Sequence, residues 1–344
     1  MKKVVLNICL VLFVATANVK AQAPGEAVEY MNQMGNSFTE LKDETWKYLK
    51  AVTRGQGARR VEKKRQQLVQ EVRAKKNEVG KMKGFYSDIS LKNAVLGYLD
   101  MNYIVLTEDF EKILNMEDIA EQSYDLMEAY ILAKEKANEK LEDAGEVLDA
   151  AQKEFAAAHD ITIIEAEMDK KSQRIEQAGN ALAYYNDVYL IFFKAFKQEA
   201  YVLDAMNRAD VNAMEQNINV MLSYSEECQA KLDTLARYNG DGALRAAAGK
   251  VIQFYKAEAE KDFPGQVDFY LKKDNFEKQQ KIFDAKGKKS RTQEDVDNFN
   301  NAVSEFNAAV ASFNATNERI NKQRSELLES WNKSVDVFFN KHTN

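Results

Sequence analysis

Apolar residues recur every three to four positions along most of this chain, a pattern typical of amphipathic α-helices. It predicts helices at about 27–52, 58–83, 89–114, 115–158, 163–207, 209–237 and 293–341. Gly55 and Gly57 end the first helix, and the turn Gly84–Asp88 supplies Ser87 or Asp88 as the N-cap of the third. We therefore expect an all-α protein.

The composition agrees with long helices. The chain has 344 residues with only 2 prolines and 14 glycines, and 45% of its residues are hydrophobic and 30% charged. Helix breakers are therefore scarce, and the apolar content argues against a disordered chain. This length accommodates one large domain or two moderate ones, each with a sizeable core.

The first residues have the order of a secretory signal peptide. Lys2 and Lys3 precede an apolar stretch over 4–17, and small residues follow. We expect a signal peptide over 1–21, cleaved after Ala21, because cleavage after Ala23 would place Pro24 beside the scissile bond. The protein would then be exported to the periplasm or outer surface of a Gram-negative bacterium.

A retained membrane anchor is the alternative for this segment, but its apolar run is well below the ~20 residues that span a bilayer. Cys9 lies inside the apolar core, too early for a lipoprotein anchor. No later stretch is apolar enough to span a membrane, so we expect no transmembrane span in the mature chain.

Removal of residues 1–21 leaves an acidic chain. The full chain has 48 basic and 54 acidic residues, and three lysines lie in the removed segment, so the mature net charge is 45 minus 54, or −9. Such a protein is a poor candidate for nucleic-acid binding. Cys228 alone remains among the cysteines and lies on an apolar stripe, which favours a buried core thiol over a reactive one.

The second half of the chain resembles the first. A shift of 153 residues aligns Leu91 with Leu244 and Leu99 with Ile252, and a shift of 155 aligns Tyr30 with Tyr185. The fourth helices begin alike at a shift of 177, from Met116–Ile119 to Gln293–Val296, so the second copy has 24 extra residues, an insertion at about 264–291. Chance similarity between helical stretches is the alternative.

A duplication predicts the domain organisation. We expect two tandem antiparallel helical-bundle units of about four helices each, at 24–162 and 163–344, joined through a long central helix. Residues 182–206 hold the densest aromatic block of the chain and open the second unit. Because apolar residues cover nearly every face of this block, we predict that it is the joint that makes the two bundles one body.

The last helix, 293–341, has the spacing of a coiled coil. Apolar residues recur every seven positions, at Phe299, Phe306, Phe313, Ile320 and Leu327, while Asn317 and Arg324 fall on the seam and weaken it. Packing on the chain's own helices is the favoured interpretation. The alternative is a homo-oligomer formed through 293–330.

Candidate chemistry is sparse. The two histidines, His159 and His342, belong to no Glu-x-x-His pair of the kind a di-iron bundle needs, and one cysteine with two distant histidines does not make a zinc site. His159 lies where a helix breaks, which favours a cap or connector role. The turn Gly55–Gly57 lacks the strand that a dinucleotide site requires. We predict no catalytic, cofactor or metal site, and a protein that is not an enzyme.

One charged segment distinguishes the two copies. From Arg54 to Lys83 the chain has eleven basic residues against three glutamates, whereas the matching helix at 209–237 has a net charge of −3. A basic helix on an acidic exported protein is a candidate contact for an anionic surface such as lipid phosphates or acidic glycans. The candidate contact residues are Arg59, Arg60, Lys63, Lys64, Arg65, Arg73, Lys75 and Lys76. The alternatives are a solvated face and pairing with acidic helices of the same molecule.

Short motifs resemble a known family. They are Glu29–Asn32, Tyr184–Asp187, the turn Tyr238–Asp241 and Glu294–Val296 with its phenylalanine-spaced helix. Each half is similar to the unit of a family of exported all-helical bacterial surface proteins of unknown function, first named from spirochaetes and common in Bacteroidetes. The resemblance implies no enzyme activity and no cofactor. Family members are often single-unit lipoproteins, whereas this chain has two units and lacks the lipid-bearing cysteine.

The sequence therefore predicts an exported, non-enzymatic binding or structural protein of the cell envelope, whose partner is a protein, a glycan or another envelope component. The alternative is a periplasmic holdase whose long helices grip unfolded clients.

Overall fold

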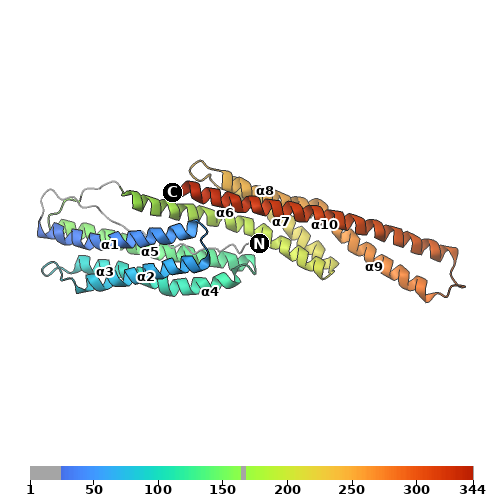
Figure 1. Cartoon of the computed structure of the whole chain (residues 1–344), viewed down its shortest axis with the longest axis horizontal. Helices are drawn as coiled ribbons and strands as arrows, with labels where there is room; N and C mark the ends of the chain where they lie inside the picture. The colour runs from blue at the N-terminus through green and yellow to red at the C-terminus, as the bar shows by residue number, and fades with distance from the viewer. Residues whose placement is uncertain (1–24, 164–167, 344) are drawn as a thin grey trace. The chain divides into compact units, whose positions relative to one another are not determined.

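The computed structural model describes residues 25–163 and 168–343, and these residues form an all-α fold (Figure 1). The described part contains no strand; its only β-type pairings are the isolated bridges Phe85↔Asp88 and Tyr238↔Asp241. The predicted fold class is confirmed. The expected signal peptide, 1–21, lies outside the described residues.

By its contacts the chain forms two compact units, which divide inside helix α6 between Asn186 and Asp187. The first unit also contains the end of the last helix, from Asp336. The helices up to this division are α1 (Glu26–Thr53), α2 (Ala58–Lys81), α3 (Ser90–Ile104), η1 (Val105–Asp109), α4 (Phe110–Ala120), α5 (Tyr124–Ala158) and the start of α6 (Lys170–Asn207).

The second unit contains the rest of α6 and the helices that follow it. These are α7 (Val211–Thr234), α8 (Ala243–Ala257), η2 (Glu258–Asp262), α9 (Phe263–Ala285) and most of α10 (Gln293–His342). The segments η1 and η2 are short π-helical turns that continue α3 and α8 without a break.

In the first unit, α2 packs against α1 and α3, and α3 and α4 pack against α5. The apolar faces of these amphipathic helices meet in a core that includes Phe38, Tyr48, Leu68, Leu99 and Tyr130, all fully buried. Each such side chain contributes about 1.5–3 kcal/mol by leaving water. The spacing of these residues, rather than a motif, therefore determines the bundle.

The predicted start of the fourth helix near Asn115 is wrong. The helix of α3 continues through η1 and α4 to Ala120, and α5 begins at Tyr124. Ser123 is the N-cap: its hydroxyl accepts a hydrogen bond from the Leu126 amide at 3.2 Å. Residues 116–119 consequently lie inside α4, and the alignment at a shift of 177 compares the interior of one helix with the start of another.

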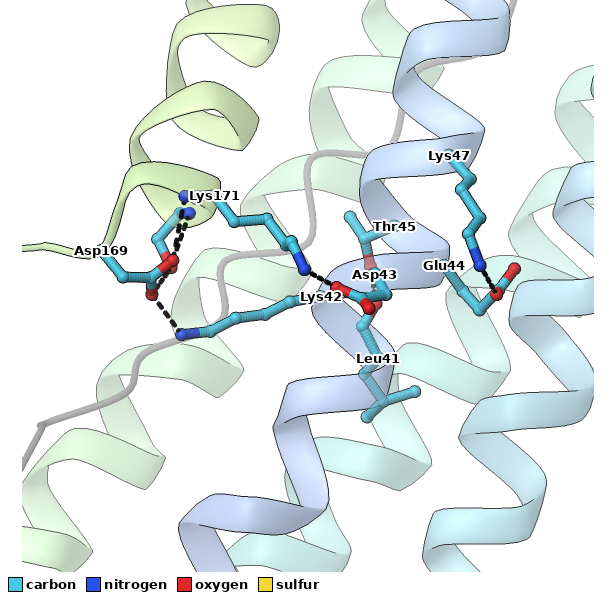
Figure 2. A network of polar contacts seen from close by, with 9 residues as sticks. Leu41, Lys42, Asp43, Glu44, Thr45, Lys47, Asp169 and Lys171 are labelled. Carbon is cyan, nitrogen blue, oxygen red and sulfur yellow. Dashed lines mark hydrogen bonds and ion pairs between the residues drawn. The ribbon is translucent and has the colours of Figure 1, made fainter.

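The central helix begins later than predicted, at Lys170 instead of about 163. Asp169 determines this start, since its Oδ1 accepts hydrogen bonds from the amides of Lys171 (2.9 Å) and Ser172 (3.1 Å). Two ion pairs fix the same turn to α1: Lys42 Nζ lies 2.7 Å from Asp169 Oδ2, and Lys171 pairs with Asp43 (Figure 2). The first turn of α6 is thus fixed within the first unit.

Several element bounds recur at a constant offset of 153 residues. Helix α2 at 58–81 corresponds to α7 at 211–234, α3 at 90–104 to α8 at 243–257, and η1 at 105–109 to η2 at 258–262. The bridge Phe85↔Asp88 likewise recurs as Tyr238↔Asp241. The two series of elements therefore have the same lengths, the same turn and a π-helical segment at the same place.

The predicted insertion, about 264–291, is largely helical and forms α9. Phe269, Phe276 and Phe283 recur every seven residues along it, and their rings contact the seven-residue series of α10. The ring centroids of Phe276 and Phe306 lie 4.8 Å apart, and those of Phe283 and Phe299 lie 4.4 Å apart. Figure 1 shows α9 beside α10 as a helical hairpin. These phenylalanines thus pack on the chain's own neighbouring helix, while oligomerisation through 293–330 stays a prediction.

In the aromatic block at 182–206, Phe192 and Phe193 are buried, and Phe192 stacks on Trp331 of α10 with centroids 4.8 Å apart. Both residues belong to the second unit. The predicted role of this block as the joint between the two bundles stays a prediction.

Candidate functional site

The candidate basic residues lie on α2 and fall into two groups. Lys64, Arg65, Lys75 and Lys76 are half-buried and engaged by neighbouring side chains, whereas Arg59, Arg60, Lys63 and Arg73 are exposed. Sequence reasoning treated all eight as equivalent, because charge alone does not show which side chains have partners.

Arg65 is part of the packing between helices. Its guanidinium pairs with Glu62, donates a hydrogen bond to the Leu106 carbonyl at 2.6 Å and lies 4.0 Å from the centre of the Phe110 ring. The carbonyl belongs to the π-helical segment η1, where the helical hydrogen-bond pattern changes. Arg65 therefore has a structural role and is not available to an external anion. Lys64, beside it, donates a hydrogen bond to Gln67 Oε1 at 2.9 Å.

Lys75 and Lys76 pair with acidic residues of the same unit. Lys75 contacts Glu40 of α1 at 2.5 Å and Glu78 at 3.0 Å, and Lys76 pairs with Asp100 of α3. The hydrogen bond with Glu40 raises the pKa of Lys75, so the ammonium stays charged. For these residues the alternative interpretation, pairing inside the molecule, is confirmed.

The four exposed residues define what we call the basic face of α2: Arg59, Arg60, Lys63 and Arg73. Among the described residues no ion pair or side-chain hydrogen bond engages them. The exposed positions at helical spacing along this face are Arg59, Lys63, Gln66, Gln70, Arg73, Asn77 and Lys81. None of them is a carboxylate, and the acid that contacts this face, Glu62, accepts a hydrogen bond from Gln66 while it pairs with Arg65.

The matched helix α7 has no such face. The positions 153 residues after Arg59, Lys63 and Arg73 are Asn212, Gln216 and Glu226. Since α2 and α7 have matched bounds, the difference is one of surface chemistry and not of backbone.

His159 and Cys228 have structural surroundings. His159 caps the C-terminus of α5, where sequence analysis placed it, and its Nε2 lies 2.9 Å from Asp88 Oδ2. Hydrogen bonds from Ser90 and His159 lower the pKa of Asp88 to about 2. Cys228 is fully buried, as predicted, and burial raises the pKa of its thiol to about 11, which disfavours a reactive thiolate.

A buried charge cluster lies in the second unit. Arg324 of α10 pairs with Glu199 of α6 and, at 2.9 Å, with Glu258 of η2. Both carboxylates have almost no exposure, and this burial raises the pKa of each. The residue that interrupts the heptad seam is therefore the partner of two acids that are distant in sequence.

Sequence reasoning also missed Tyr86, in the turn between α2 and α3. This residue is 79% exposed and has a left-handed backbone with φ 51°. A signal was present: the offset of 153 residues aligns Tyr86 with Asn239 of the turn Tyr238–Asp241, and asparagine is the residue that such a position favours. Glu26, Glu29, Tyr30 and Phe85 lie around Tyr86 and line a cavity with it.

Within 25–163 and 168–343, no group of three or more His, Cys, Asp and Glu side chains could hold a metal ion. None of the helices described there combines the length and the apolar content that crossing a membrane requires. No protein-family model, curated protein or solved structure matches this chain.

Proposed function

We propose that this chain is an exported, non-enzymatic binding or structural protein of the cell envelope, built from two tandem helical units that arose by duplication. Export rests on the N-terminal sequence pattern, and duplication is supported by the recurrence of α2, α3 and η1 at an offset of 153 residues. A duplicated bundle is free to specialise one copy for binding while the other retains the common backbone.

The observation that carries the binding function is the basic face of α2. A solvated helix face normally mixes both signs of charge, but this face presents Arg59, Lys63 and Arg73 without a carboxylate. Each arginine or lysine near an anionic surface contributes about 1 kcal/mol of attraction. The four residues of the basic face together would hold an anionic lipid or polysaccharide surface in spite of the acidic net charge of the chain.

A charge-neutralised variant tests this function. It carries Arg59→Gln, Arg60→Gln, Lys63→Gln and Arg73→Gln, and binding is measured by co-sedimentation with anionic phospholipid vesicles, neutral vesicles and an acidic polysaccharide. The parent protein should bind an anionic target, more weakly as salt rises, and the variant should lose at least about tenfold in affinity. Comparison of the anionic vesicles with the acidic polysaccharide shows whether the protein binds a lipid or a glycan.

The matched control removes the same number of charges elsewhere. Lys273, Lys281, Lys288 and Lys289 are exposed on or near α9, and their replacement by Gln should leave binding unchanged. Equal loss in both variants would show that net charge, and not the α2 face, determines binding. Absence of binding by the parent protein to every anionic target would refute the proposal.

A periplasmic holdase is the second candidate, supported by the hairpin of α9 and α10. The phenylalanines between these helices are only half-buried, and Leu271 and Ile282 of α9 are each 52% exposed. A holdase would suppress the aggregation of an unfolded client at stoichiometric amounts. Leu271→Asp with Ile282→Asp, which leaves the ring contacts intact, should abolish that suppression; no suppression by the parent protein would exclude this function.

A further inference from the structure

The first unit contains an open cavity of about 480 Å³ between the start of α1 and the turn that connects α2 to α3. Its volume falls in the range of small-molecule sites. Three aromatic rings line it, those of Tyr30, Phe85 and Tyr86, together with the carboxylates of Glu26 and Glu29. None of the residues of the basic face of α2 lines this cavity.

The aromatic rings form a corner of the cavity. The centroid of the Phe85 ring lies 5.6 Å from that of Tyr30 and 4.9 Å from that of Tyr86, with interplanar angles of 45° and 78°. The hydroxyl of Tyr86 donates a hydrogen bond to Glu26, which fixes the ring at the mouth of the cavity. An aromatic surface is thus held in place although 79% of Tyr86 is exposed.

The turn that carries Tyr86 is closed and strained. The amide of Asp88 donates to the Phe85 carbonyl at 2.8 Å, and a Cβ atom at Gly84 would lie 2.7 Å from the Ile89 side chain. Left-handed backbone is unfavourable for a tyrosine, and such strain persists where a side chain has a use. The equivalent turn of the second unit has Asn239 at this position, so the fold itself does not require the tyrosine.

The polar groups of the cavity are available to a ligand. The hydroxyl of Tyr30 is buried beside the backbone of Phe85 and has no side-chain hydrogen-bond partner within the described part of the chain. Glu29 and Lys83 are exposed, and no described side chain pairs with either. The cavity therefore offers donors and acceptors side by side with aromatic surface.

This combination selects one class of ligand. A cation would meet Lys83, an anion would meet Glu26 and Glu29, and an apolar ligand would desolvate these charges and the Tyr30 hydroxyl. A sugar ring has neutral hydroxyls that both donate and accept, and an apolar C–H face that packs on an aromatic ring. We propose that this cavity binds a sugar residue, which stacks on Tyr86 and hydrogen-bonds with Glu29, Lys83 and Tyr30.

Saturation-transfer NMR on the purified protein tests this proposal. The probes are glucose, galactose, mannose and N-acetylglucosamine with their β-linked disaccharides, and choline and inorganic phosphate serve as charged comparisons. At least one sugar should receive saturation on its ring C–H protons, and choline and phosphate should not bind. The affinity for that sugar is then measured by calorimetry.

Two variants and one control locate the site. Tyr86→Asn introduces the residue of the second unit and keeps the turn, and Glu29→Gln keeps the shape of the side chain; each should weaken sugar binding at least tenfold. Glu111→Gln, at an exposed position of α4, should not change it. A melting temperature that is not lowered in either variant separates lost binding from lost folding. Binding of no sugar, binding of choline or phosphate instead, or equal sugar affinity in Tyr86→Asn and the parent protein would overturn the proposal.

Discussion

Tyr86 and Asn239 occupy the same position in two turns that lie 153 residues apart, and both have left-handed backbone, with φ 51° and 48°. Asn239 is followed by Gly240, which also has positive φ, and Asn-Gly is the pair that such a tight turn favours. Tyr86 is followed by Ser87 and lacks this local support. The turn at Asn239 therefore has residues that favour its backbone conformation, whereas the turn at Tyr86 adopts the same conformation with residues that disfavour it.

Replacement of Tyr86 by Asn should raise the stability of the first unit. The left-handed conformation disfavours tyrosine by about 1 kcal/mol, and an exposed ring contributes little burial in return. Asn239→Tyr should lower stability by a similar amount. Denaturant unfolding of both variants checks the pair. A lower unfolding midpoint for Tyr86→Asn would show that the contacts of the ring, including the hydrogen bond with Glu26, outweigh the backbone strain.

A second prediction compares Lys42 and Lys47, two lysines of α1 that form a partly buried and an exposed ion pair (Figure 2). The side chain of Lys42 is 10% exposed and pairs with Asp169, whereas that of Lys47 is 50% exposed and pairs with Glu44. Lys42→Met should destabilise the first unit by about 1–2 kcal/mol, below the value for a fully buried pair because Asp169 is partly exposed. Lys47→Met should change stability by less than about 0.5 kcal/mol, since exposed pairs contribute little. Equal effects in denaturant unfolding would contradict this.

The same ion pair predicts a response to acid. Burial raises the pKa of Asp169, but hydrogen bonds from Lys42 and Ser172 outweigh burial and hold it below its usual value. A carboxyl whose pKa is lowered by folding stabilises the folded state above its unfolded pKa, near 3.8, and loses this contribution as the pH falls through the folded pKa. Unfolding measured between pH 5 and pH 2 should therefore show a smaller loss of stability in Asp169→Asn than in the parent protein.

In the buried cluster of Arg324, Glu199 and Glu258, we expect substitutions of the arginine and of Glu258 to lower stability by very different amounts. Arg324→Met leaves the two buried acids Glu199 and Glu258 without their cation and should destabilise the second unit by about 3–5 kcal/mol. Glu258→Gln should be much milder, because burial raises the pKa of Glu258 and its neutral form is already favoured. Thermal unfolding of the two variants compares them, and an equal loss in both would mean that Glu258 is fully ionised.

The pH dependence of this cluster has the opposite sign to that of Asp169. A carboxyl whose pKa is raised by folding stabilises the folded state fully below its unfolded pKa, near 4.5, and this contribution is lost as the pH rises toward the folded pKa. Between pH 5 and pH 9 the parent protein should lose more stability than Glu258→Gln. If both proteins lost the same stability over this pH range, ionisation of Glu258 would not be the cause of the loss.

The spacing of apolar residues along the sequence predicted most of the helices. It did not predict helix caps or contacts between residues that are distant in sequence. The helices followed from apolar spacing, but the start of α5 depends on Ser123 and the start of α6 on Asp169, single caps that a periodic pattern does not reveal. Arg324 looked like a defect in a coiled-coil seam because its partner Glu258 lies 66 residues away. The sequence also could not show which basic residues of α2 are free to bind an external anion. Lys75 and Lys76 are engaged by Glu40 and Asp100, which lie on other helices.

The hairpin of α9 and α10 supports a final prediction, about local stability. Its aromatic contacts connect two helices only, so Phe276 and Phe306 are half-buried, with ring centroids 4.8 Å apart and nearly parallel. Phe276→Ala should lose about 1–2 kcal/mol, less than a fully buried phenylalanine, and the loss should be confined to the hairpin. Hydrogen exchange should accelerate in α9 and the facing turns of α10 and stay unchanged in α7. Leu271→Ala, a change on the exposed side of the same helix, is the control and should leave exchange nearly as in the parent protein. Acceleration throughout the second unit would instead show that the hairpin and the α7–α8 pair unfold together.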